Sequence, residues 1–287
     1  MKISEILRRK RVSLSFEVFP PKKDAPFAPV AEAVRRLCAA KPAFMSVTYG
    51  AGGGANVNTL AVAEEVLAHG VDALAHLTCV ASSREKIAGE LARFHNAGIE
   101  NILALRGDRT DEMKESGEYG HASDLATDIA SHGGFCIGGA CYPECHPDCA
   151  HLADDIANLK YKVDAGVEFL VTQMFFDNNI FYRYLAKVRE AGIGIPVVAG
   201  VMPVTNGRQI ARIVKLSGTY LPSRFKAIID RFGDDPAQMA AAGIAYATEQ
   251  IIDLVANGVN AIHLYTMNKP AIAEAIVRNL GSIIGMD

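Results

Sequence analysis

The strongest constraint on the fold is a phrase that recurs along the chain: a helical stretch, a glycine, a Val or Ile, and then a run of apolar residues. It occurs five times, at Gly70, Gly98, Gly166, Gly192 and Gly258. A glycine just past a helix adopts the left-handed conformation that ends the helix, and the next apolar residue packs back as a strand begins. The phrase therefore predicts repeated units in which a helix leads into a strand.

The hydrophobic pattern predicts that these helices alternate with buried parallel strands. Ile87, Leu91 and Phe94 share one helix face, and Ser82 and Glu85 have the spacing of a capping box before them. The apolar runs are continuous, as expected for parallel strands covered on both faces. Three further runs, at 13–19, 44–49 and 135–142, bring the predicted strands to eight.

Eight strands alternating with helices in 287 residues predict an α/β fold, the (β/α)8 TIM barrel, as one domain over residues 1–287. A doubly wound open sheet is the alternative. It is disfavoured because no strand runs into a G-x-G-x-x-G turn, and the glycine-rich segment 50–54 has a different spacing. The long interval 204–260 predicts extra helices before the last strand.

Composition disfavours several classes of partner. The 29 Lys and Arg residues against 32 Asp and Glu residues leave a net charge of −3, without the basic surface that nucleic-acid binding requires. No run approaches the ~20 apolar residues of a membrane span. The segment 1–11 lacks the apolar core of a signal peptide, so we expect a short amphipathic helix on the domain and a cytoplasmic protein.

In a TIM barrel the reactive groups lie where the strands end, on the loops that lead into the helices. Polar residues occupy these ends along the chain: Glu17, Thr48, His76, Thr78, Arg106, Asp108, Tyr142, Gln173 and Tyr265. Glu17 stands among Phe16, Val18 and Phe19, where desolvation would raise the pKa of its carboxyl and suit it to deliver a proton near neutral pH. An ion pair inside the barrel is the alternative for Glu17.

The loop that contains Arg106, Gly107 and Asp108 suits a cofactor. Gly107 allows close approach of the backbone, and the opposite charges on either side of it suit a polar ring or a phosphate-bearing group.

Three cysteines, Cys141, Cys145 and Cys149, recur at four-residue spacing near two histidines. Thiolates and imidazoles suit Zn²⁺, but the usual zinc hairpin has two cysteines two to four residues apart and rarely contains prolines such as Pro143 and Pro147. We favour reduced thiols without a metal. A zinc-dependent, pterin-binding methyltransferase and a non-catalytic flavin- or folate-binding subunit remain alternatives.

The segments SFEVFPPK, FMSVTYGAG, HLTC, ALRGD, GHASDL, YPECHP, NLKYKVDAG, TQMFFD, PVTNGRQ and YTMNK occur in this order over nearly the whole chain. They resemble the methylenetetrahydrofolate reductase family. The resemblance implies an FAD-bearing homo-oligomeric enzyme of one-carbon metabolism and methionine biosynthesis. It would take a hydride from NADH or NADPH and, by a ping-pong sequence, reduce 5,10-methylenetetrahydrofolate to 5-methyltetrahydrofolate.

The same resemblance assigns residues to roles. It implies that Glu17 is the catalytic acid and Asp108 the catalytic aspartate beside flavin and folate. It implies FAD contacts from Thr48, Tyr49, Ala51, His76, Arg106, Gly107, Asp108, His121, Ala122, Tyr142, His146, Asp155, Asn158 and Lys162. It implies substrate contacts from Glu17, Thr48, Asp108, Gln173, Gln209 and Lys269. His121, Lys269 and Ile213 depart from the family pattern, which has a tyrosine, an arginine and, in some members, an aromatic residue there.

Overall fold

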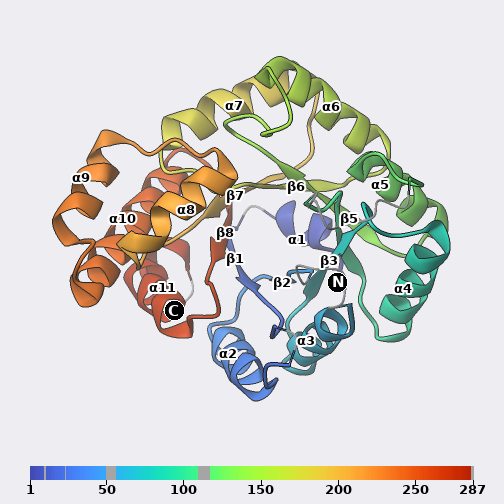
Figure 1. The fold of residues 1–287 in the computed structure, drawn as a ribbon, viewed down its shortest axis with the longest axis horizontal. Helices are drawn as coiled ribbons and strands as arrows, with labels where there is room; N and C mark the ends of the chain where they lie inside the picture. Colours follow the sequence, from blue (N-terminus) through green and yellow to red (C-terminus); the bar gives the residue numbers. More distant parts are fainter. Residues whose placement is uncertain (10, 23, 50–55, 109–116, 286–287) are drawn as a thin grey trace.

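The computed structural model describes residues 1–9, 11–22, 24–49, 56–108 and 117–285, and its centre is a closed barrel of eight parallel strands (Figure 1). The strands are β1 (Ser13–Val18), β2 (Met45–Val47), β3 (Ala73–Thr78), β4 (Asn101–Leu105), β5 (Cys136–Cys141), β6 (Phe169–Thr172), β7 (Val197–Val201) and β8 (Ala261–Tyr265). Each strand is hydrogen-bonded to the next, and β8 closes on β1. The TIM barrel prediction is confirmed, and closure rejects the doubly wound sheet.

Helices surround the barrel. They are α1 (Ile3–Leu7), α2 (Ala28–Ala39), α3 (Asn56–Ala68), α4 (Arg84–Asn96), α5 (Ala122–His132), α6 (Leu152–Asp164), α7 (Asn178–Glu190), α8 (Gly207–Ser217), α9 (Ser223–Phe232), α10 (Pro236–Ala256) and α11 (Pro270–Ile284). Three of them, α8, α9 and α10, lie between β7 and β8, which confirms the extra helices predicted there. Among the described residues, none of these helices combines the length and apolarity that crossing a bilayer demands.

The recurring glycines behave as predicted. All five have positive φ, between 75° at Gly70 and 108° at Gly166, and each lies between the end of a helix and the next strand. The predicted capping box was wrong by one residue. Ser83, not Ser82, is the N-cap of α4, and its hydroxyl accepts a hydrogen bond from the backbone N–H of Lys86 at 3.2 Å. Ser82 is buried instead.

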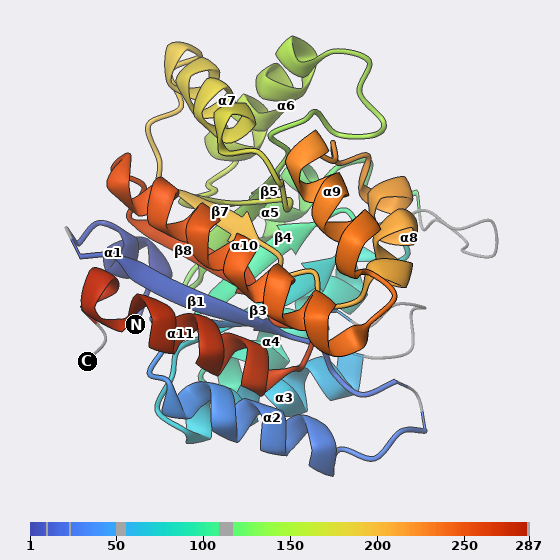
Figure 2. The same cartoon turned by 90° about the vertical axis from the view of Figure 1, so that its left-hand side faces the viewer.

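The short N-terminal helix does more than lie on the domain. Ile3 of α1 is fully buried and packs with Phe44, Leu74 and Phe169 in an apolar cluster inside the barrel. Its backbone N–H donates to the side-chain oxygen of Asn101 at 2.8 Å. Figure 2 shows α1 at one end of the barrel and α8 at the other. Helix α1 therefore closes the end of the barrel where the strands begin and leaves the opposite end for chemistry.

Candidate active site

Two adjoining cavities lie at the end of the barrel where the strands end. The outer cavity, about 780 Å³, extends over the ends of β3, β4 and β5 toward α6, and the inner cavity, about 340 Å³, reaches into the barrel beside Glu17. Six residues line both cavities: Thr48, His76, Leu105, Asp108, Ala140 and Tyr142. The two cavities are therefore parts of one site with a wide outer portion and a narrow inner portion.

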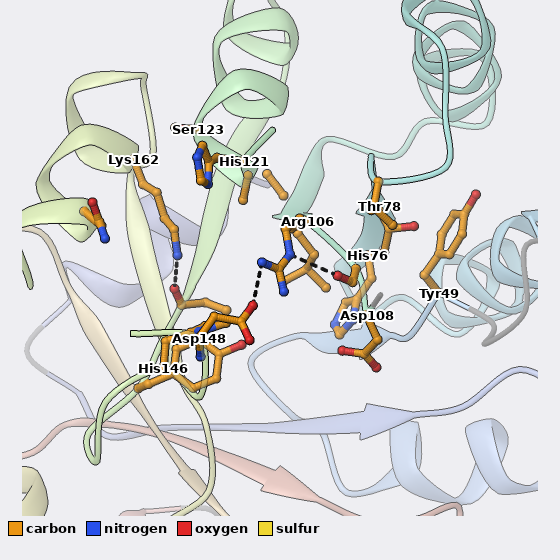
Figure 3. Close-up of a pocket in the computed structure, with 18 of the residues that line it drawn as sticks. Tyr49, His76, Thr78, Arg106, Asp108, His121, Ser123, His146, Asp148 and Lys162 are labelled. Atoms are coloured by element: carbon orange, nitrogen blue, oxygen red, sulfur yellow. Dashed lines mark hydrogen bonds and ion pairs between the residues drawn. The ribbon is translucent and has the colours of Figure 1, made fainter. Parts of the chain in front are cut away.

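The outer cavity brings together nearly all residues assigned to FAD by the resemblance (Figure 3). It is lined by Thr48, Tyr49, His76, Arg106, Gly107, Asp108, His121, Ala122, Tyr142, His146, Asp155, Asn158 and Lys162. Ala51 lies outside the described residues. These side chains come from β-strand ends and from α5 and α6, so the chain folds segments more than 100 residues apart onto one wall.

Two cations that the resemblance assigns to FAD, Arg106 and Lys162, line the outer cavity. The Arg106 guanidinium pairs with the Asp148 carboxylate at 2.8 Å, and the Lys162 ammonium donates to the Ala140 carbonyl at 3.0 Å (Figure 3). Burial lowers the pKa of Lys162. An ammonium has three N–H donors, so one hydrogen bond to Ala140 leaves capacity for a ligand. Although Arg106 and Asp108 flank Gly107, Arg106 forms its ion pair with Asp148, and its Nε donates to the Gly107 carbonyl at 3.3 Å.

His76 stands where the two cavities meet. It is 7% exposed, and its Nε2 atom has no hydrogen-bond partner among the described residues. Burial lowers the pKa of its imidazole to about 3, so the ring is neutral at physiological pH. A buried nitrogen without a partner costs free energy, which a ligand with a matching polar atom would recover.

Glu17 lies on the wall of the inner cavity and is 7% exposed. Burial raises the pKa of its carboxyl to about 8, and a hydrogen bond donated by the Ser46 hydroxyl would lower it. This confirms the expected effect of the apolar surroundings. The nearest candidate for an ion pair is His76, with 3.9 Å between its Nε2 and Glu17 Oε2. Because the His76 ring is neutral and Glu17 holds its proton, the contact is not an ion pair.

The predicted substrate residues separate into three groups. Gln173 lines the inner cavity together with Glu17, Thr48 and Asp108, as the assignment requires. The Gln209 side chain lies outside the described part of the structure. Lys269 lines neither cavity; it is exposed just before α11, and its ammonium donates to the Thr205 hydroxyl at 3.2 Å. Its contact with the substrate stays a prediction.

Several polar residues of the site were not assigned from the sequence. Asp148 and Lys86 line the outer cavity, and Ser46, Thr172 and His263 line the inner one. Thr172 is the last residue of β6, whereas Ser46 and His263 lie inside their strands rather than at the ends. Their alternation with Met45, Val47 and Leu264 would have placed them on the barrel interior once the strand register was known.

The three clustered cysteines lie in different environments: Cys141 is in the hydrophobic core, and Cys149 is at the outer cavity. Cys141 is 2% exposed, and burial raises the pKa of its thiol to about 12. Cys149 lines the outer cavity, and its sulfur accepts a hydrogen bond from the Asn158 amide at 3.6 Å. Cys145 donates to the Cys149 carbonyl at 3.5 Å. Within the described residues, no three His, Cys, Asp or Glu side chains gather closely enough to hold a metal ion.

A family model described as "Methylenetetrahydrofolate reductase" matches residues 2–281. The chain belongs to the methylenetetrahydrofolate reductase family. The match runs from α1 to α11, so the barrel and both cavities lie within the family's shared region.

Two relatives illustrate how family members differ in length. The chain is 35% identical over 300 residues to "Methylenetetrahydrofolate reductase (NADH) 1" of Arabidopsis thaliana, covering 98% of the chain and 50% of that protein. It is 33% identical to "5,10-methylenetetrahydrofolate reductase" of Pectobacterium carotovorum subsp. carotovorum, covering 94% of the chain and 91% of the relative. The chain thus spans about half of the plant relative and nearly all of the bacterial one.

A solved structure agrees with the fold. An uncharacterized protein from Clostridium thermocellum that binds two copies of 5-methyl-5,6,7,8-tetrahydrofolic acid superimposes over 100% of both chains with a TM-score of 0.67. Its sequence identity is 11%, so this likeness supports the family's barrel architecture alone.

Proposed function

We propose that the chain is an FAD-dependent reductase that converts 5,10-methylenetetrahydrofolate to 5-methyltetrahydrofolate at the expense of NADH or NADPH. The observation that carries the proposal is a buried carboxylic acid, Glu17, in an inner cavity that is continuous with a larger cavity bearing cations. Family membership supports the same reaction. Homo-oligomeric assembly and a cytoplasmic location stay predictions from the sequence.

The outer cavity fits FAD in size and chemistry. Its volume of about 780 Å³ lies in the upper part of the ~300–1,000 Å³ range of ligand pockets. Arg106 and Lys162 would hold the pyrophosphate through charge-assisted hydrogen bonds. The unpartnered Nε2 of His76 would hydrogen bond with a polar atom of the flavin. When bound, FAD would supply hydride transfer, first from the nicotinamide nucleotide and then to the folate.

The residues of the inner cavity would prepare the folate. Its five-membered ring must open before the methylene carbon accepts a hydride, and opening requires a proton on the departing nitrogen. Glu17 would donate that proton because its carboxyl, with a pKa of about 8, still carries a proton at neutral pH. Gln173 and Asp108 line the same cavity and would orient the pterin by hydrogen bonds. NAD(P)H supplies the hydride and Glu17 the proton, so the product gains two hydrogens.

The direct test is purification followed by a visible absorption spectrum and anaerobic addition of NADH or NADPH. We expect a yellow protein that the nucleotide bleaches and methylenetetrahydrofolate recolours. A protein that stays colourless with added FAD and yet reduces the folate would contradict the flavin part of the proposal. A flavoprotein that never transfers its electrons to the folate would contradict the substrate.

Removing a cation from the outer cavity should weaken FAD retention. Arg106→Ala and Lys162→Ala each remove one charge-assisted contact, worth about 1.5–3 kcal/mol or roughly 10- to 100-fold in Kd. Fluorescence titration of the apoprotein with FAD measures the change. Lys160→Ala is the matched control, because Lys160 is also on α6 but is exposed and pairs with Asp164 at 2.9 Å. Equal FAD affinity in all three variants would show that Arg106 and Lys162 do not bind the phosphates of FAD.

The stability of the apoprotein should depend on pH through Glu17. Its pKa is raised from 4.5 to about 8, so between these values the folded protein holds a proton that the unfolded chain has lost. The stabilising contribution is therefore complete below pH 4.5 and is lost as the pH rises through 8. Glu17→Gln removes this titration. The Tm of the variant minus that of wild type should rise from pH 5 to pH 9 by at least about 2 °C. A constant difference would show that Glu17 ionises normally.

A further inference from the structure

Three polar side chains that the reaction does not use lie inside the barrel beside Glu17. Ser15, Ser46 and His263 are each 1% exposed. Ser46 is the register partner of Glu17 across β1 and β2, and His263 is the register partner of Ser15 across β1 and β8. Buried polar groups of this kind persist only when their hydrogen bonds are satisfied.

The four side chains form a continuous series of hydrogen bonds. The Ser15 hydroxyl lies 3.0 Å from the Ile262 carbonyl and 2.8 Å from His263 Nδ1. The other ring nitrogen, His263 Nε2, lies 3.1 Å from the Ser46 hydroxyl. Ser46 in turn hydrogen bonds with the Glu17 carboxyl.

The carbonyl at one end sets the direction of every bond in the series. A carbonyl oxygen only accepts, so Ser15 must donate its one proton to Ile262, and His263 Nδ1–H must donate to Ser15. A neutral imidazole with its proton on Nδ1 accepts at Nε2, so Ser46 donates to His263. The Ser46 oxygen is then left with lone pairs toward Glu17. Only a protonated Glu17 can satisfy that last contact.

We infer that Ser46 and His263, with Ser15 behind them, are positioning residues that present a hydrogen-bond acceptor to Glu17 and so keep its carboxyl in the proton-bearing form. This inference rests on the proposed function only for its catalytic consequence. The direction of the hydrogen bonds itself is a property of the apoprotein.

The charges around Glu17 agree with this direction. An imidazolium at His263 would donate from both nitrogens and reverse the series, but burial and the nearby His76 lower the pKa of His263 to about 3. His76 is also neutral, the pKa of Tyr265 is raised well above its usual value, and burial raises the pKa of Tyr142 to about 12. Asp108 is the other carboxyl on this cavity, and no Lys or Arg stands among its described lining residues.

Ser46 could lower the pKa of Glu17 only by donating its proton to the carboxylate. Because Ser46 donates its proton to His263 instead, it does not lower the pKa of Glu17. The hydrogen-bond geometry therefore raises that pKa further than burial alone would.

The test is a carbon-13 NMR titration of the glutamate carboxyls in the apoprotein, with the Glu17 signal assigned by its loss in Glu17→Gln. His263→Phe keeps a ring to stack on Phe44, whose centroid is 5.9 Å away, but removes the acceptor for Ser46. Ser46 is then free to donate to Glu17, and we expect the pKa of Glu17 to fall by at least about one unit. Ser15→Ala removes the acceptor that keeps the ring proton of His263 on Nδ1. It should therefore also lower the pKa of Glu17 without altering Glu17 itself.

Conservative variants separate this role from simple packing. His263→Gln keeps one donor and one acceptor, and Ser15→Thr keeps the hydroxyl, so both should hold the pKa of Glu17 close to the wild-type value. An unchanged or higher pKa in folded His263→Phe and Ser15→Ala would overturn the inference. Loss of the effect in only one of them would also overturn it, because the series requires both.

Activity provides a second and independent readout. In His263→Phe the rate of folate reduction relative to wild type should fall progressively from pH 6 to pH 9, whereas a structural defect would lower it by one factor at every pH. If the NMR titration gives the expected shift but the wild-type protein does not reduce methylenetetrahydrofolate, the proposed function fails and the hydrogen-bond assignment stands. If the folate is reduced but the pKa of Glu17 does not change in the variants, the proposed function stands and the hydrogen-bond assignment fails.

Discussion

Glu17→Gln is expected to slow the reduction of methylenetetrahydrofolate by at least ~10²-fold while reduction of the enzyme by NADH or NADPH stays within a few-fold of wild type. Glutamine has the size of glutamic acid and retains an N–H that can donate to Ser46, so the packing of the inner cavity is preserved. It cannot release a proton to the folate nitrogen. Hydride transfer from the nicotinamide nucleotide needs no acid, so only the second half of the reaction should suffer.

Stopped-flow absorbance measures the two half-reactions separately. The enzyme is first mixed with the nicotinamide nucleotide, and the reduced enzyme is then mixed with methylenetetrahydrofolate. A similar loss in both half-reactions would mean that Glu17 supports the barrel or the cofactor. Normal folate reduction would assign the proton donor to another residue. The pH series of Tm values shows whether the variant is folded and whether Glu17 carries the raised pKa.

The second large effect is expected at a glycine outside both cavities. Gly243 is buried in α10, and a Cβ atom there would stand 1.9 Å from the Val204 carbonyl oxygen and 2.8 Å from its carbon. Both are backbone atoms, so the contact cannot be relieved by a change of rotamer. Gly243→Ala should therefore destabilise the protein by about 3 kcal/mol or more, despite the better helix propensity of alanine. This corresponds to a fall in Tm of roughly 6 °C or more.

Gly89→Ala is the matched control for this prediction. Gly89 also lies inside a helix, α4, but it is exposed and a Cβ atom there would meet nothing within 4 Å. Alanine should stabilise that helix by about 0.5–1 kcal/mol. Thermal unfolding followed by circular dichroism compares the two variants. Equal Tm values would show that α10 can move away from the segment that follows β7.

Much of the outer cavity was predictable because it is built from strand ends. In a parallel barrel every strand points the same way, so residues that follow consecutive strands meet at one end whatever the details of packing. Thr78, Arg106 and Tyr142 could be placed together from their positions at or just after the ends of strands. The resemblance to the family added the residues of α6, such as Lys162, which lie on a helix where no strand-end rule applies.

Local sequence by itself determined the order of helices and strands, through the positive-φ glycines and the continuous apolar runs, and it determined that Glu17 would be desolvated. The tertiary structure alone decided which polar groups meet inside the barrel. Glu17 faces Ser46 because closure sets the register of β1 against β2, and a shift of one residue would turn Ser46 to the opposite face of its strand. Arg106 pairs with Asp148, about forty residues away, because two loops converge at the barrel end. Such contacts depend on distances in space, which spacing along the chain does not encode.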